Sequence, residues 1–181
     1  HLEVVRVLVA AGGDVNQLRR GGAVNSLGQA GSTNVSALLM AVQRGHFEVV
    51  DVLLKAGAST ELKAVDDSKY AVTPLATAIV MVTNYIERQW TEVPVQAYIE
   101  VIKRLVAAGA SVFEPSVKQT AKHLMQVGRG SIDGAGVGGG VYSDAHCQEV
   151  MELLASGFNA AGGINHATNE QETGVGAKDE D

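Results

Sequence analysis

One short segment, an amphipathic helix closed by glycine, occurs four times along this chain of 181 residues. Its clearest copy reads HFEVVDVLLKAGA at 46–58, with apolar residues at helical spacing from Val49 to Leu54. The other copies are HLEVVRVLVAAGG at 1–13, YIEVIKRLVAAGA at 98–110 and CQEVMELLASGF at 147–158. Glycine tolerates the left-handed conformation in which helices commonly end. The copies therefore predict closing glycines at Gly12, Gly57, Gly109 and Gly157.

The stretch 36–59 is the one uninterrupted unit in the sequence. It predicts a first helix that begins near Ser36 and ends at Gly45, a tight turn at His46, and a second helix that ends at Gly57. Two helices of about ten residues cannot bury both of their apolar faces alone, so the unit needs copies stacked on either side. Similar first helices are expected after Thr73-Pro74 and at Thr120.

These segments resemble the ankyrin repeat, whose pattern is T-P-L-H-x-A-A-x-x-G-H followed by E-[VI]-V-x-x-L-L-x-x-G-A-[DS] and often V-N. The match is nearly continuous at 45–58, and Gly12-Gly13-Asp14-Val15-Asn16 preserves the end of the unit. The resemblance covers roughly residues 1–160. It implies an all-α solenoid of stacked helix-turn-helix units joined by hairpin loops, and a function in protein binding.

The spacing departs from the family period of 33 residues, and each departure predicts an insertion. We expect an ankyrin array over 1–160 and a disordered acidic tail at 161–181. The array divides into a half repeat at 1–16, an intact repeat at 36–59, a repeat at 73–111 with an insertion near 80–97, and a degenerate repeat at 120–160 with a glycine-rich insertion at 127–143. The part from Thr83 to Val95 is expected to be a loop or irregular helix outside the stack.

The turn that opens each first helix differs between repeats. Only the fourth pairs a threonine with a histidine, at Thr120 and His123, as the family's T-P-L-H turn does. That pairing predicts the turn hydrogen bond in the fourth repeat and leaves it open in the middle repeats. In the half repeat, Leu2, Val5 and Leu8 are expected to expose apolar surface.

Loops of two kinds join the predicted repeats. Residues 17–35 are rich in Gly, Ser, Asn and Gln and indicate an extended hairpin or a flexible loop. Residues 60–72 carry Asp66-Asp67-Ser68 between apolar positions, which predicts a short β-hairpin.

Composition restricts the function classes. The net charge is −6, and the tail carries five acidic residues against one lysine, so the array itself is nearly neutral. A nucleic-acid binder would need a basic stripe, and the Arg19-Arg20 pair is too small.

No stretch reaches 18 apolar residues, which predicts no membrane insertion. A single cysteine fits a reducing compartment, so we expect a cytoplasmic or nuclear protein. The chain lacks an initiator Met and starts within a repeat, which indicates a fragment.

Catalytic and cofactor patterns are weak. Residues 134–139 spell G-x-G-x-x-G, but no strand pattern precedes them, so a flexible linker is the interpretation. His146-Cys147 has no accompanying ligand or base at suitable spacing, and Cys147 is interpreted as an ordinary helix residue. We expect no cofactor, no metal, no small-molecule substrate and no enzymatic activity.

The remaining function is recognition of another protein. In the ankyrin family the first helices and hairpin tips form the binding surface, and large aromatic residues and Arg are common hot spots. The candidates on this chain are Gln43, Arg44, Asp66, Asp67, Lys69, Tyr70, Arg88 and Trp90. Trp90 could instead fold back on its own repeat, and the charged loop residues could be merely solvated.

Two other functions stay open. The chain could be the regulatory segment of a larger enzyme such as a kinase or ubiquitin ligase, or a degenerate array without a tight partner.

Overall fold

The structure, a computed structural model, describes residues 2–19, 35–65, 71–88, 93–128 and 143–167. In chain order the elements are α1 (Leu2–Ala10), β1 (Leu18–Arg19), β2 (Val35–Ser36), α2 (Ala37–Gln43), α3 (Phe47–Lys55), β3 (Ala64–Val65), β4 (Ala71–Val72), α4 (Pro74–Arg88), α5 (Val95–Ala107), α6 (Pro115–Gly128) and α7 (Ser143–Ala167).

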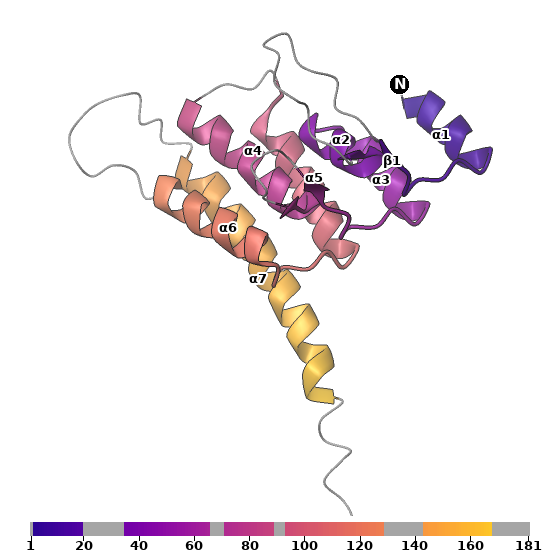
Figure 1. Ribbon diagram of the computed structural model, residues 1–181. Helices are drawn as coiled ribbons and strands as arrows, with labels where there is room; N and C mark the ends of the chain where they lie inside the picture. Colours follow the sequence, from indigo (N-terminus) through magenta and orange to yellow (C-terminus); the bar gives the residue numbers. More distant parts are fainter. Residues whose placement is uncertain (1, 20–34, 66–70, 89–92, 129–142, 168–181) are drawn as a thin grey trace, which may run out of the picture.

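The helices form two stacked layers (Figure 1). The inner layer is α2, α4 and α6 in that order, and the outer layer is α1, α3, α5 and α7. Each inner helix packs against the outer helix that follows it in sequence. This arrangement confirms the all-α solenoid, and α4 and α5 lie at its centre. Most of the fully buried large side chains of the core are on those two helices, among them Leu75, Ile79, Ile99, Ile102 and Leu105.

Polar caps start the first helices of the middle repeats. Ser36 Oγ accepts a hydrogen bond from the Leu39 amide at 3.2 Å, and Thr73 Oγ1 accepts one from the Ala76 amide at 3.3 Å. Both oxygens satisfy an amide that the helix itself leaves unpaired. The turn hydrogen bond, whose presence the sequence did not decide for the middle repeats, is therefore present in both of them.

The predicted turn at Thr120 is wrong. Helix α6 begins at Pro115, and proline fits the first position of a helix. Thr120 lies in the interior of α6, where its hydroxyl donates to the carbonyls of Ser116 at 2.9 Å and Val117 at 3.0 Å. His123 is consequently on the body of the helix, with Nε2 3.3 Å from Glu87 Oε1 on α4.

Three of the predicted closing glycines end the helices that precede them. Gly12, Gly57 and Gly109 have φ values of 81°, 84° and 83°, and Gly45 between α2 and α3 has 66°. Gly157 does not close a helix. It lies within α7, where an added Cβ would come 2.9 Å from Val106 Cγ1 on α5. This glycine therefore permits close packing of α7 on α5, and the helix continues to Ala167, past the expected start of the tail at 161.

The insertion expected near 80–97 is largely helical. Helix α4 extends to Arg88 and α5 begins at Val95. Thr83 is buried, and Tyr85 and Ile86 pack against the core. The expectation that this part lies outside the stack is wrong for 83–86, because these residues pack on the core and the next one, Glu87, pairs with His123 of α6.

Two short antiparallel hairpins stand between the repeats. Leu18 and Arg19 of β1 pair with Ser36 and Val35 of β2. Ala64 and Val65 of β3 pair with Val72 and Ala71 of β4, which confirms the second predicted hairpin. The tip at 66–70, the loop at 20–34 and most of the glycine-rich insertion lie outside the described residues.

A polar side chain links each of the first two turns to the next repeat. Asn16 Oδ1 accepts from the Ser59 amide at 2.7 Å, and its Nδ2 donates to the Gly57 carbonyl at 3.1 Å. Glu61 Oε1 accepts from the Ser111 amide at 3.0 Å. Asn16 and Glu61 occupy the same position relative to their closing glycines, so this link is a repeated feature of the array.

Equivalent leucines on α1 and α3 should respond differently to truncation. Leu53 is 3% exposed and Leu8 is 60% exposed. We expect Leu53→Ala to lower the free energy of unfolding by roughly 2–5 kcal/mol and Leu8→Ala to change it by no more than about 0.5 kcal/mol. Urea unfolding followed by circular dichroism measures both. Equal losses would contradict the stacking order.

Candidate functional site

The exposed side of α2 carries three long side chains. Met40 is 46% exposed, and Gln43 and Arg44 are also exposed, while Leu38, Leu39, Ala41 and Val42 are buried against the stack. A hydrogen bond to the main chain holds this end of α2 in place: the Tyr98 hydroxyl donates to the Gln43 carbonyl at 3.3 Å. The Gln43 and Arg44 side chains are therefore presented to solvent from a rigid support.

A groove runs between the second hairpin and the inner helices α4 and α6. Its volume is about 590 Å³, and it is lined by Lys63, Val72, Val80, Glu114, Pro115, Ser116, Gln119, Thr120 and His123. Two of the lining residues form an ion pair, with Lys63 Nζ 2.9 Å from Glu114 Oε2. Ser116 Oγ is buried and has no hydrogen-bond partner among the described residues. A mostly apolar groove with a few polar groups suits a peptide segment or a protruding side chain.

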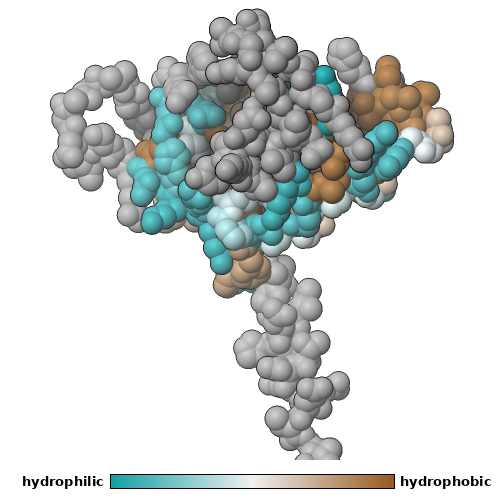
Figure 2. Space-filling view, viewed as in Figure 1, coloured by the Kyte–Doolittle hydropathy of each residue, from teal (hydrophilic) through white to brown (hydrophobic). Residues whose placement is uncertain are grey.

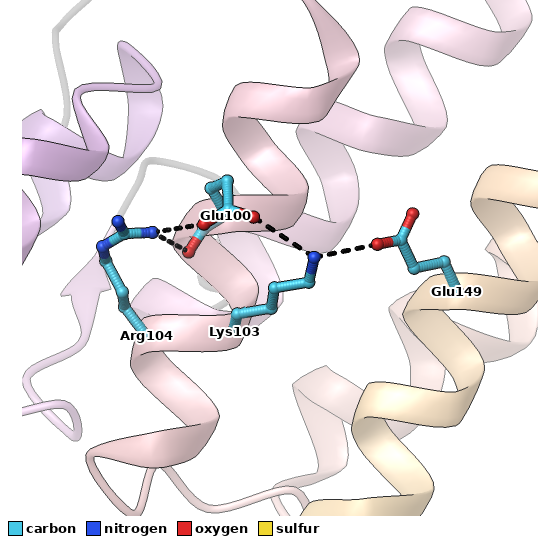
Figure 3. Close-up of polar contacts among 4 residues, drawn as sticks. All are labelled: Glu100, Lys103, Arg104 and Glu149. Atoms are coloured by element: carbon cyan, nitrogen blue, oxygen red, sulfur yellow. Dashed lines mark hydrogen bonds and ion pairs between the residues drawn. The ribbon is translucent and has the colours of Figure 1, made fainter.

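The outer face is instead held by charges that belong to the protein itself. Glu100 of α5 accepts from Arg104 Nη1 at 2.7 Å and from Lys103 Nζ at 3.2 Å, and Lys103 also reaches Glu149 Oε1 of α7 at 3.0 Å (Figure 3). The Arg104 guanidinium lies 4.9 Å from the centre of the Phe47 ring on α3. This network connects three outer helices, which makes the outer face a structural surface.

The same contacts shift two ionisation equilibria. Hydrogen bonds from Arg104, and next from Lys103, lower the pKa of the Glu100 carboxyl below its ordinary value of 4.5. Hydrogen bonds to Glu149 and Glu100 raise the pKa of Lys103 above 10.5. Both shifts favour the charged forms that make the network.

Cys147 packs between α6 and α7. Its thiol is buried and donates to the Leu124 carbonyl at 3.8 Å, and Gly128 leaves the room that it occupies. Cys147 was interpreted as an ordinary helix residue, and these contacts are consistent with that interpretation. Among the described residues, no group of three or more His, Cys, Asp or Glu side chains could hold a metal ion. In the same part of the chain, none of the helices combines the length and apolarity needed to cross a membrane.

The structure locates only part of the predicted site. Gln43 and Arg44 are exposed and adjoin the start of the segment that leads into α5, because Gly45 lies against Val93 and Tyr98. Arg88 ends α4, and its side chain is not among those described. Asp66, Asp67, Lys69, Tyr70 and Trp90 lie outside the described residues. The groove beside α6 was missed, because the sequence placed the start of that helix at Thr120.

Comparison with protein-family models matches residues 33–66 to the ankyrin repeat. These residues include the helix pair α2 and α3, the cap at Ser36 and the first strand of the second hairpin. The chain contains an ankyrin repeat at residues 33–66. Ankyrin repeats are non-catalytic modules for protein–protein interaction. A comparison with the curated proteins finds no match for this ankyrin-repeat chain.

The Glu100 network should make the stability of the array depend on pH. A carboxyl whose pKa is lowered by folding stabilises the folded state above its unfolded pKa, and this contribution is lost as the pH falls through the folded pKa. We expect the Glu100→Gln variant to lose less stability than the parent between neutral pH and pH values below 4.5. Urea unfolding at a series of pH values measures the slope. An unchanged slope would show that the network contributes nothing.

Proposed function

We propose that this ankyrin-repeat chain is a non-catalytic scaffold that binds another protein through the exposed side of its inner helices and the adjoining loops. We call this surface the recognition face: Met40, Gln43 and Arg44 on α2, the groove beside α4 and α6, and the loops that contain the remaining sequence candidates. The observation that supports it is the division between the two faces. The outer face uses its charged side chains in internal ion pairs, whereas the α2 side chains of the recognition face project into solvent.

The proposed partner has to match a surface that is apolar in the groove and polar around it. An apolar segment can enter the groove beside Val72, Val80 and Pro115, and polar or acidic groups can meet Gln119 and Arg44. The partner is proposed to be a protein rather than a nucleic acid, a membrane or a small molecule. The cytoplasm, or alternatively the nucleus, is the proposed location.

The second candidate function is regulation of a larger enzyme, such as a kinase or a ubiquitin ligase, to which the repeats would be attached. The same recognition face would then bind the enzyme's own catalytic domain or its substrate. The full-length reading frame separates the two proposals. A catalytic domain in it overturns the independent scaffold, and repeats alone overturn the regulatory segment.

Affinity capture with matched variants tests the recognition face. We expect a protein captured by the parent chain to bind Arg44→Ala or Trp90→Ala about tenfold or more weakly, since Arg and Trp are frequent hot spots. Lys55→Ala is the control, because the Lys55 side chain is 75% exposed on outer helix α3. Calorimetry with the purified partner gives the dissociation constants. Equal binding by all variants would overturn the assignment of this face.

A further inference from the structure

The two hairpins stand side by side in a row that has no third member. Strand β2 of the first hairpin contacts β3 of the second. The connection between α3 and α4 runs from 56 to 73 and includes β3 and β4, whereas the connection between α5 and α6 runs only from 108 to 114. All residues of this shorter connection are described, and they form turns but no strand. The row of hairpins therefore ends at β4, although the stack of helices continues with α5 and α6.

The groove beside α4 and α6 lies where a third hairpin would stand. Val72 of β4 lines it, together with Val80 of α4 and Pro115 and Gln119 of α6. A strand of a two-stranded ribbon bonds to its partner along one edge only, so its other edge keeps unpaired backbone groups. Strand β3 contacts β2 of the preceding hairpin, whereas β4 borders the groove. One wall of the groove is therefore an open strand edge.

The charged side chains of the groove are already paired within the protein. Lys63 Nζ lies 2.9 Å from Glu114 Oε2, and His123 Nε2 lies 3.3 Å from Glu87 Oε1 of α4. A charged occupant would have to compete with these internal contacts or leave its own charge without a partner in the groove. The groove therefore favours an uncharged segment.

Two uncharged side chains of α6 offer hydrogen-bonding groups. Ser116 Oγ is buried without a partner among the described residues, and in the same part of the chain the exposed Gln119 side chain makes no hydrogen bond. A carboxamide carries a donor and an acceptor, as a peptide group does. Figure 2 shows hydrophilic residues over most of α6, whereas Val72, Val80 and Pro115 give the groove its apolar lining. An extended segment matches both parts, because successive side chains of a strand point to opposite sides.

We propose that this groove binds an uncharged, extended segment of a partner protein, which pairs with β4 as an added strand. The proposal rests on the proposed function, because the groove belongs to the recognition face. The segment takes the place of the missing third hairpin, with apolar side chains beside Val80 and Pro115 and polar side chains toward solvent. In this binding mode main-chain hydrogen bonds provide affinity, and the pockets for alternate side chains provide specificity.

Peptides selected against the chain test the groove. Random peptides displayed on phage are selected against the parent chain, and the recovered peptides are synthesised with a fluorescent label. Fluorescence anisotropy compares the parent with Gln119→Trp, which fills the groove, and with the matched control Gln126→Trp. Both glutamines are exposed on α6, and Gln126 does not line the groove. We expect Gln119→Trp to bind roughly tenfold or more weakly and Gln126→Trp to bind as the parent does.

Methylation of single backbone nitrogens in such a peptide tests the strand pairing. A strand bonds to one neighbouring edge through every second residue. We therefore expect methylation to weaken binding roughly fivefold at alternate positions and to have little effect at the positions between them. A helical or irregular peptide would give no such alternation.

Each contrary result overturns a different part of the proposal. Equal binding of every recovered peptide by Gln119→Trp and the parent would overturn the groove as the binding site. Binding in the groove without alternation would overturn the added strand and leave the recognition face standing. Self-association of the parent chain that Gln119→Trp abolishes would identify a second copy as the occupant and overturn a separate partner. The capture experiment with Arg44→Ala and Trp90→Ala uses neither of these variants, so failure of the recognition face is distinguished from failure of the strand pairing.

Discussion

The structure depends on the inability of a two-helix unit to bury its own apolar faces. Helices α4 and α5 have a neighbour on both sides, and they carry most of the fully buried large side chains, among them Leu75, Ile99 and Leu105. Among the described residues, the α1 helix packs against α3 alone, and it contains no buried residue. Because each repeat contacts only its neighbours, the stability of a repeat depends on its place in the stack as much as on its own sequence. Leu8 and Leu53 occupy equivalent positions in similar helices and differ in exposure for this reason.

Most of the fold could be predicted because its signals are local. The apolar stripe of α3, the glycines with positive φ at its two ends and the turn residues of the second hairpin are each written within a few positions of one another. The start of α4 was predicted because Thr73 is followed by a proline that fits the first position of a helix, although the hydrogen bond of Thr73 itself was left open. Repetition then determined how the units stack.

The errors concern features decided by distant contacts. Gly157 has the sequence context of a closing glycine, but Val106 and Val112 approach it so closely that its role is to accommodate a crossing helix. Thr120 fits the turn motif of the family, but α6 already begins at Pro115, five residues earlier, with the Lys118 amide donating to the Glu114 carbonyl. The candidate site was predictable only in part for the same reason. Gln43 and Arg44 follow from the first-helix pattern, whereas the groove requires the hairpin and two helices from different repeats.

The side-chain hydrogen bond that links the turn of one repeat to the turn of the next is not repeated at the last repeat. Asn16 and Glu61 each bond the backbone of the next turn from the same position after the closing glycine. The third residue in this series is Phe113, which has no polar group to make that bond. Its ring instead lies 4.9 Å from the ring of Phe158 on α7. A turn after Gly157 would have offered a backbone amide here, but the continuing helix offers an aromatic side chain. The change from a polar to an apolar residue at this one position therefore matches the replacement of the turn by the long helix α7.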